Sequence, residues 1–386
     1  MILADSIQRL QTETAFEVLA RAAELSRQGK DIINLGIGQP DFQTPDHVVE
    51  AAAKAMRDGH HGYTPANGIL ELREAVAADI AARRGAEVHP DNIVIMPGGK
   101  PTMFFAIMLF GQPGVEIMYP DPGFPIYRSM IEYTGATPVP IALREENAFA
   151  FSAEEVLSQI TPATRLIIAN SPGNPTGGAT PRSEVEALVN GLEAYPDVAL
   201  MSDEIYSRML YGGRAHVSFL EYPEIRDRLI LLDGWSKTYA MTGWRLGYSV
   251  WPDGLVEKAT RLCINAHSCV NAPTQFAGIA ALTGPQDAVD AMMTAFDQRR
   301  QVIVEVLNDL PGFTCLDPAG AFYAFPNVSG TGEGAKALQK RFLEEAGVAT
   351  VAGPSFGVTA DDYIRFSYAN SVENIEEAMR RIRAIL

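Results

Sequence analysis

The sequence predicts an α/β fold in which a large domain with a mostly parallel, seven-stranded sheet is joined to a smaller α+β domain. From about Asn92 onward, short apolar, β-branched runs lead into turns rich in Gly, Pro, Asn or Asp, and then into helical patterns. Such alternation is typical of a parallel α/β sheet. The chain has 386 residues, and chains above roughly 250–300 residues usually divide, so we expect two domains.

Seven segments carry the strand pattern, and several of them lead directly into polar or glycine-rich turns. They span residues 93–96, 116–119, 137–141, 166–169, 199–202, 229–232 and 246–250. In open α/β sheets, ligands bind beyond the carboxyl ends of the strands. We therefore expect the unusual residues that follow these strands to share one site.

The C-terminal part of the chain changes character, with a helix expected over 288–308, short runs at 321–325 and 364–368, and a closing helix over 372–385. Gly284 and Pro285 mark the change. The predicted division is an N-terminal arm and part of the small domain at 1–45, the large domain at 46–285, and the small C-terminal domain at 286–386.

The overall charge argues against a nucleic-acid partner. The chain carries 31 Lys and Arg against 47 Asp and Glu, a formal net charge of −16, whereas phosphate backbones are bound by clustered basic residues. The sequence has neither an apolar run of the roughly 18 residues needed to span a bilayer nor a recognisable signal peptide. We therefore expect a soluble, cytoplasmic protein without a membrane partner.

The three cysteines, Cys263, Cys269 and Cys315, cannot all pair, which fits a reducing compartment. Cys263, His267 and Cys269 are close enough in sequence to suggest a metal site. A structural zinc ion needs four ligands, and its usual ligand spacing is absent. We therefore expect inert side chains here and no metal.

Lys237 lies in LLDGWSKTYAMTGWRLGY, residues 231–248, just past an expected strand, and Arg245 follows eight positions later. A chain that turns from a strand into a helix can direct both side chains into one cleft. A lone lysine in a turn is usually solvated, so the residues at the other strand ends decide its interpretation.

Two further strand ends carry polar side chains. ALMSDEIYSRM places Asp203 at the end of a buried strand, with Tyr206 three residues on. A buried carboxylate needs a partner, so Asp203 either pairs with a cationic ligand or caps the N-terminus of a helix. SPGNPTG, residues 171–177, follows another strand, and Asn174 precedes a proline that favours an extended backbone.

PGGKPTMFF, residues 97–105, places Gly99 and Lys100 at the start of an apolar helix. Free amides at a helix N-terminus bind phosphate, so these two residues are the predicted cradle, with Arg245 as the fixed cation. The alternative is a glycine-rich helix start without a ligand.

Together these residues meet the demands of pyridoxal 5'-phosphate (PLP). This cofactor needs an amine for a Schiff base, an anion beside the pyridine nitrogen, and donors for the phenolic oxygen. It also needs a face that stacks on the ring and a cradle for the phosphate. Each demand finds a candidate at a strand end.

The sequence resembles the class I/II, fold-type I PLP-dependent aminotransferases, of the aspartate aminotransferase-like kind, over essentially its whole length. The motifs that carry the resemblance are GIGQPDF at 36–42, YTPANGILELREA at 63–75, GGK at 98–100, SPGNPTG at 171–177, SDEIY at 202–206, SKTYAMTGWRLGY at 236–248 and IRFSYA at 364–369. Jointly these motifs are highly specific, whereas each one alone is weak.

The resemblance implies a role for each matching residue. Lys237 would be the Schiff-base lysine and proton shuttle, Asp203 would pair with the pyridine nitrogen, and Asn174 and Tyr206 would bond the phenolic oxygen. Phe124, in DPGFPIY, would stack on the ring.

The substrate and the second subunit are also implied. Arg365 would bind the substrate α-carboxylate bidentately, with Gly38 lining the same pocket. Tyr63 would reach the phosphate site of a neighbouring subunit, which implies a homodimer with shared active sites. One position departs from the family: Gly234 replaces a serine that often binds the phosphate, and Ser236 is the candidate substitute.

The expected reaction is transfer of an amino group between an L-α-amino acid and a 2-oxo acid by a ping-pong mechanism. A PLP-dependent β- or γ-lyase of the C–S lyase type is the alternative, because the same lysine and ring serve both reactions. A third possibility is a non-catalytic PLP-binding regulator, but such a protein would need a DNA-binding domain, which the short N-terminal segment and the acidic composition disfavour. A dinucleotide-binding dehydrogenase is a further possibility, because Gly330, Gly332 and Ala335 match a loose phosphate-loop pattern. Pro326 interrupts the strand that should precede this loop, which favours a surface loop.

The side-chain specificity stays open at this stage. Some prokaryotic aspartate aminotransferases use a lysine at the position of Lys100 to bind a distal carboxylate, which permits a dicarboxylate substrate. The segment INAHSCVNAP lacks the arginine that other aspartate-specific relatives carry there. Phe104, Phe105 and Tyr127 can equally line an apolar pocket.

Overall fold

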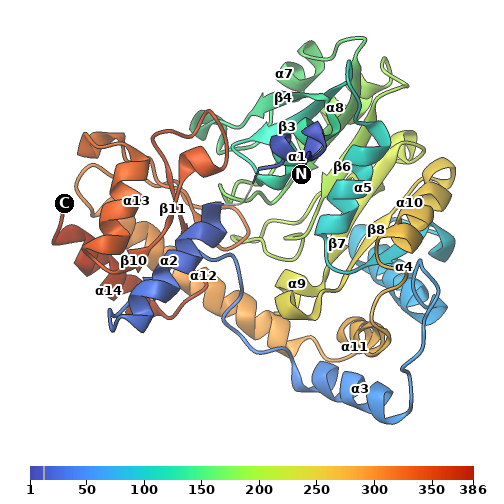
Figure 1. The fold of residues 1–386 in the computed structure, drawn as a ribbon, viewed down its shortest axis with the longest axis horizontal. Coiled ribbons are helices and arrows are strands. Elements are labelled where there is room, and N and C mark those ends of the chain that lie inside the picture. Colours follow the sequence, from blue (N-terminus) through green and yellow to red (C-terminus); the bar gives the residue numbers. More distant parts are fainter. Residues whose placement is uncertain (12–13) are drawn as a thin grey trace.

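The computed structural model describes residues 1–11 and 14–386 and is built around a seven-stranded sheet (Figure 1). The strands run in the order β2 (Ile93–Met96), β8 (Gly247–Val250), β7 (Leu229–Gly234), β6 (Ala199–Asp203), β5 (Thr164–Asn170), β3 (Glu116–Asp121) and β4 (Thr137–Ala142). Strand β8 is antiparallel to both of its neighbours, and the other pairings are parallel. The predicted fold class is confirmed, and each predicted strand end lies within two residues of the observed one.

Helices cover both faces of this sheet because successive side chains of a strand point to opposite sides. In β5, Ile167 packs on the face covered by α4, α8 and α11, whereas Leu166 and Ile168 pack on the face covered by α5, α6 and α10. Both faces are therefore buried, and the central strands are near-continuous apolar runs, as expected for a mostly parallel sheet.

The helices begin and end as follows: α1 (Asp5–Arg9), α2 (Thr14–Arg27), α3 (Asp46–Arg57), α4 (Leu70–Arg84), α5 (Lys100–Phe110), α6 (Ile126–Thr134), α7 (Ala153–Ser158), α8 (Arg182–Leu192), α9 (Trp235–Thr238), α10 (Asp253–Ala266), α11 (Ala272–Thr283), α12 (Asp287–Asn308), α13 (Ala335–Glu344) and α14 (Val372–Arg383). The expected helices in the C-terminal part are α12 and α14, and α14 ends two residues earlier than predicted.

The C-terminal elements carry two small sheets. Strands β11 (Val351–Ala352), β12 (Ile364–Ser367) and β9 (Tyr323–Ala324) form an antiparallel sheet, and β1 (Ile33–Asn34) pairs in parallel with β10 (Val348–Ala349). A separate apolar core joins these strands to α12, α13 and α14. The division at 45 and 285 stays a prediction.

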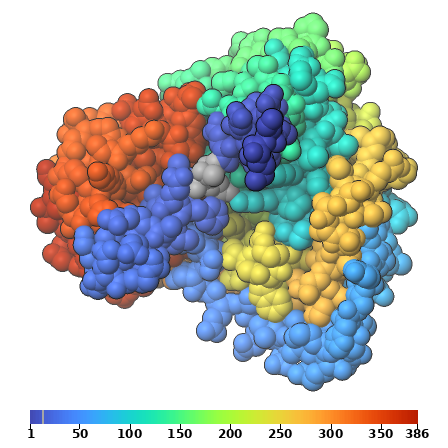
Figure 2. Space-filling view, in the orientation of Figure 1, coloured from blue at the N-terminus to red at the C-terminus, as the bar shows by residue number. Residues whose placement is uncertain are grey.

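The N-terminal segment contacts both parts of the molecule. Helix α1 lies on α6, where Arg9 Nε donates to the carbonyl of Glu132 at 2.8 Å. Helix α2 lies against the C-terminal part, where Arg21 binds Glu344 through two hydrogen bonds of 2.7 and 3.0 Å. Figure 2 shows the blue N-terminal residues across the junction between the orange-red and the cyan-green parts of the surface. Over the described ranges, none of the helices has the length and apolar character needed to cross a membrane.

Candidate active site

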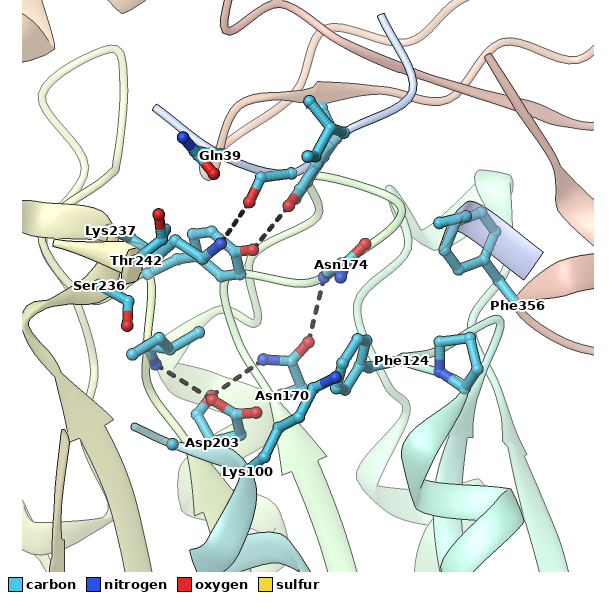
Figure 3. Close-up of a pocket in the computed structure, with 18 of the residues that line it drawn as sticks. Gln39, Lys100, Phe124, Asn170, Asn174, Asp203, Ser236, Lys237, Thr242 and Phe356 are labelled. Carbon is cyan, nitrogen blue, oxygen red and sulfur yellow. Dashed lines mark hydrogen bonds between the residues drawn. The ribbon is translucent and has the colours of Figure 1, made fainter. Parts of the chain in front are cut away.

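A cavity of about 280 Å³ lies beyond the carboxyl ends of the sheet strands, between the sheet and the C-terminal elements. Every predicted site residue except Tyr63 lines it. These residues are Gly38, Gly99, Lys100, Phe124, Asn174, Asp203, Tyr206, Ser236, Lys237, Arg245 and Arg365. Figure 3 shows Lys100, Asn174, Asp203 and Lys237 converging on a common space from different elements.

Lys237 lies on α9, the single helical turn that follows β7, and its Nζ donates to the carbonyl oxygen of Gly38 at 2.5 Å. Nζ lies 5.8 Å from the ring centre of Tyr206. Desolvation, together with the positive charges of Arg365 and Arg245, lowers the pKa of Lys237 from 10.5 to about 7. A large part of the amine is therefore neutral near pH 7, which nucleophilic attack and proton abstraction both require.

Asp203 ends β6 and is buried. Burial raises the pKa of this carboxyl to about 6, against two hydrogen bonds that favour the carboxylate. The Tyr127 hydroxyl donates to Oδ2 at 2.6 Å, and the amide of Ile205 donates to Oδ1 at 3.2 Å. The chain after Asp203 forms turns rather than a helix, so the alternative N-cap role is wrong.

A close stack of glycines surrounds the start of α5. A Cβ at Gly98, whose φ is +90°, would lie 2.2 Å from Arg245 Nη2, and a Cβ at Gly247 would lie 2.7 Å from the Gly98 carbonyl carbon. Only glycine permits this approach of backbone to guanidinium. The amide of Lys100, the first residue of α5, and the Arg245 guanidinium thus form a cationic cradle that a side chain would fill.

Gly234 follows from the same packing. It pairs with Gly247 across β7 and β8, and a Cβ at Gly234 would lie 2.7 Å from the Gly247 Cα. A serine at this position would force the two strands apart. Ser236, two residues on, lines the cavity instead, so a hydroxyl remains beside the cradle.

Arg365 lies on β12, nearly fully buried, and its guanidinium is held from several sides. Nη1 donates to Asn174 Oδ1 at 2.7 Å and Nη2 donates to the Gly36 carbonyl at 2.6 Å. The ring centres of Tyr323 and Phe356 lie 4.6 and 4.7 Å from Cζ. These contacts fix a planar donor in the wall of the cavity, which suits bidentate binding of a carboxylate.

Several contributors could not be named from the sequence. The hydroxyl of Tyr323 lies 2.8 Å from that of Tyr206. The side chain of Asn170 donates to the Asp203 carbonyl at 3.1 Å and accepts from the Asn174 amide at 3.1 Å. The position of Asn170 at the end of a strand was the available signal, whereas nothing local marked Tyr323.

Other candidates lie outside the cavity. Tyr63 is 92% exposed. Phe104 and Phe105, which the sequence left open as residues of an apolar pocket, do not line the cavity. Tyr127 does line it, through a ring whose hydroxyl binds Asp203. Gly330 is exposed and lies in the short 3-10 helix Ser329–Thr331 before α13.

The side chains of Cys263 and His267 each lie against an apolar or aromatic neighbour. Cys263 is buried, with Sγ 3.7 Å from the sulfur of Met96, and burial raises the pKa of its thiol to about 12. His267 stacks parallel to Phe105 with ring centres 6.3 Å apart. Within residues 1–11 and 14–386, no group of three or more His, Cys, Asp or Glu side chains is placed to hold a metal ion.

The cavity brings the amine of Lys237, the carboxyl of Asp203 and the guanidinium of Arg365 together at the carboxyl edge of an α/β sheet. The family model for aminotransferase class I and II matches residues 30–382. The aspartate aminotransferase of Geobacillus stearothermophilus is 37% identical over 392 residues, which cover 100% of this chain and 99% of that protein. The aspartate/prephenate aminotransferase of Cereibacter sphaeroides is 36% identical, with 99% and 98% covered.

Solved structures agree with the sequence relatives. The aspartate aminotransferase from Thermus thermophilus with maleate superimposes with a TM-score of 0.95 at 34% identity, covering 100% of both chains. That from Rhizobium meliloti gives 0.94 at 34% identity, covering 100% and 98%. The chain therefore belongs to the class I and II aminotransferases. It is a PLP-dependent transaminase, and these full-length relatives do not favour the lyase alternative.

Proposed function

We propose that this transaminase moves the amino group of a dicarboxylic L-α-amino acid to a 2-oxo acid by a ping-pong mechanism. One observation supports the chemistry most strongly. An amine with a pKa of about 7, at Lys237, faces the same cavity as the carboxylate of Asp203 and the guanidinium of Arg365. The cavity therefore holds a base, an anion for the pyridine ring of the cofactor and a receptor for the substrate carboxylate.

The proposed roles follow from position and charge. Bound PLP supplies an electron sink for the electrons of the substrate Cα–H bond. Lys237 Nζ holds the cofactor before substrate arrives and then accepts the proton of the substrate Cα. Asp203 holds a proton on the pyridine nitrogen, which increases the electron demand of the ring. Tyr206 and Asn174 donate to the phenolic oxygen.

The remaining cofactor contacts concern its phosphate, which the cradle at the start of α5 would hold, and the face of its ring. The amides of Gly99, just before α5, and of Lys100, its first residue, would bind the phosphate together with the side chains of Ser236 and Arg245. Phe124 would stack on the ring from the opposite wall of the cavity. Its own ring is held edge-on to that of Tyr127, with the centres 5.9 Å apart and the planes at 81°.

The substrate contacts divide between two cations. Arg365, with the backbone at Gly38, would bind the α-carboxylate. Lys100 lines the same cavity, with Nζ 5.4 Å from the Phe124 ring centre and 5.5 Å from that of Phe16, and would bind the distal carboxylate. Relatives named as aspartate aminotransferases support this choice.

Substrates with a six-membered ring in the side chain are a second candidate. The rings of Phe16, Phe124 and Phe356 line the cavity together with other apolar side chains, which favours a ring-bearing 2-oxo acid as well. Relatives named as aspartate/prephenate aminotransferases support a site that accepts both kinds of side chain.

Lys100→Met separates these possibilities. We expect kcat/KM for aspartate to fall about tenfold or more, since a charge-assisted hydrogen bond contributes about 1.5–3 kcal/mol, while kcat/KM for phenylalanine changes little. Lys258→Met, at an exposed lysine of α10, is the matched control. An equal loss for every amino donor, accompanied by weaker PLP binding, would assign Lys100 to the phosphate cradle and contradict the distal-carboxylate role.

We also propose a homodimer, a cytoplasmic location and the domain division at 45 and 285. The exposed Tyr63 would complete the phosphate site of the second subunit, so light scattering should give twice the chain mass of 41.8 kDa. A monomer at working concentrations would contradict this assembly.

Three free cysteines support the proposed cytoplasmic location, because they fit a reducing compartment.

A further inference from the structure

Asp121 is a fully buried carboxylate at the end of β3 that binds a loop far away in the sequence. Its Oδ2 accepts from the Val358 amide at 3.1 Å. Its Oδ1 accepts from the Thr359 amide at 3.2 Å and from the Thr359 hydroxyl at 2.7 Å. A buried carboxylate is costly unless donors surround it, so these contacts are required wherever the chain folds this way.

The fit between Asp121 and the loop leaves no spare room. A Cβ at Gly357 would lie 2.1 Å from Asp121 Oδ1. The amide of Gly123, two residues after Asp121, donates to the Phe356 carbonyl at 2.8 Å. The end of β3 and residues 356–359 are therefore clamped together, and we call the contacts of Asp121 with Val358 and Thr359 the Asp121 latch.

Both ends of this latch lead into walls of the cavity. On one side, Phe356 lines the cavity with its ring centre 4.7 Å from Arg365 Cζ. On the other side, Phe124 follows Asp121 by three residues and also lines the cavity. Figure 3 shows Phe124 and Phe356 on neighbouring segments that face the same space.

We propose that Asp121 is a positioning residue for the transamination reaction, which acts through Phe356 to hold the Arg365 guanidinium ready for the substrate α-carboxylate. Asp121 itself does not line the cavity. The inference rests on the proposed role of Arg365. If Asp121 acts in this way, the role of Arg365 depends on a residue that lies 238 positions before its partner Thr359.

The direct test is Asp121→Asn, whose amide nitrogen cannot accept the hydrogen bonds that the carboxylate oxygen accepts. In the free protein, amide hydrogen exchange at Val358 and Thr359 should become at least about tenfold faster, which corresponds to about 1.4 kcal/mol. In the PLP-loaded enzyme, KM for the amino donor and Kd for succinate should rise by a similar factor, with kcat changed less. Glu184→Gln is the matched control, because Glu184 accepts from the Ala153 amide at 2.7 Å outside the cavity.

A second pair of variants excludes a general loss of stability. Gly357→Ala should weaken succinate binding in the native chain, because the new methyl collides with the Asp121 carboxylate. In an Asp121→Ala background the same substitution should have little further effect, because the colliding group is gone. Non-additive effects of this kind identify residues that act together.

The outcomes separate the two proposals. If Arg365→Ala does not weaken succinate binding, the proposed role of Arg365 fails, and this inference fails with it. If Arg365→Ala weakens binding but Asp121→Asn resembles Glu184→Gln, the latch alone is refuted. Should Asp121→Ala not fold, Asp121→Asn and Gly357→Ala carry the test, and normal succinate binding in both would overturn it.

Discussion

Replacing Tyr127 by Phe removes the shortest hydrogen bond to the Asp203 carboxylate, and its effect can be worked out in the free protein. The 2.6 Å bond favours the ionised form, whereas burial raises the pKa to about 6. A hydrogen bond to a charged group contributes about 1.5–3 kcal/mol, and one pKa unit corresponds to about 1.4 kcal/mol. The pKa of Asp203 should therefore rise to about 7–8 in the variant.

The consequence is measurable at neutral pH. Asp203 would be about 90% ionised at pH 7 in the native chain and about 10–50% ionised in the variant. Because the carboxylate must pair with the protonated pyridine nitrogen, PLP affinity at pH 7 should fall about two- to tenfold. Its pH dependence should shift upward by the change in the pKa of Asp203. The assay is PLP binding to the free protein followed by absorbance across pH 5–9.

Tyr248→Phe is the control, because the Tyr248 hydroxyl also donates to a buried carboxylate, that of Asp233, at 3.3 Å but outside the cavity. That variant should keep the native pH profile. If Tyr127→Phe gives the same PLP-binding profile as Tyr248→Phe, the Tyr127 hydroxyl does not set the ionisation of Asp203, and the reasoning is refuted.

Three further predictions concern the lysine, the cradle and the carboxylate receptor. The folded-state pKa of Lys237 is about 7 against an ordinary 10.5, so this group makes the free protein less stable below pH 7, and stability recovers as pH rises from 7 to 10.5. Lys237→Met should therefore stabilise the free protein by up to about 5 kcal/mol at pH 6 in urea unfolding and by little at pH 10.5; a gain independent of pH would contradict the lowered pKa. Gly98→Ala should weaken PLP binding about tenfold or more because the new Cβ would displace the Arg245 guanidinium, whereas Gly254→Ala, in open space, should bind PLP normally. Arg365→Lys should raise KM for both the amino donor and the 2-oxo acid by about 10–100-fold because a lysine cannot bind a carboxylate bidentately; steady-state kinetics that show unchanged KM values would exclude the assigned receptor.

The sequence predicted the sheet well because its signals are local. Strands such as β5 and β6 are apolar runs that end in turn residues, and each leads into a polar side chain at the carboxyl edge of the sheet. That rule placed Asp203, Asn174 and Lys237 in one cavity. The resemblance to a known family supplied the roles of residues that no local pattern marks, including Arg365.

The partners of these residues could not be predicted in the same way. Tyr127 contacts Asp203 across 76 residues, and Asp121 contacts Thr359 across 238 residues. Such pairs depend on how elements far apart in the sequence pack against one another, and periodicity along the chain carries no information about that. The glycine at position 234 likewise stood out in the sequence only as a departure from the family's serine, and the close approach to Gly247 explains it.

The bond between Lys237 and PLP is the claim on which the other roles depend. Borohydride reduction of PLP-loaded protein, followed by peptide mass spectrometry, tests it most directly. The cofactor mass should be fixed on the peptide that contains Lys237, and Lys237→Ala should remain colourless and inactive. A label on another lysine, or turnover that persists in Lys237→Ala, would contradict the account.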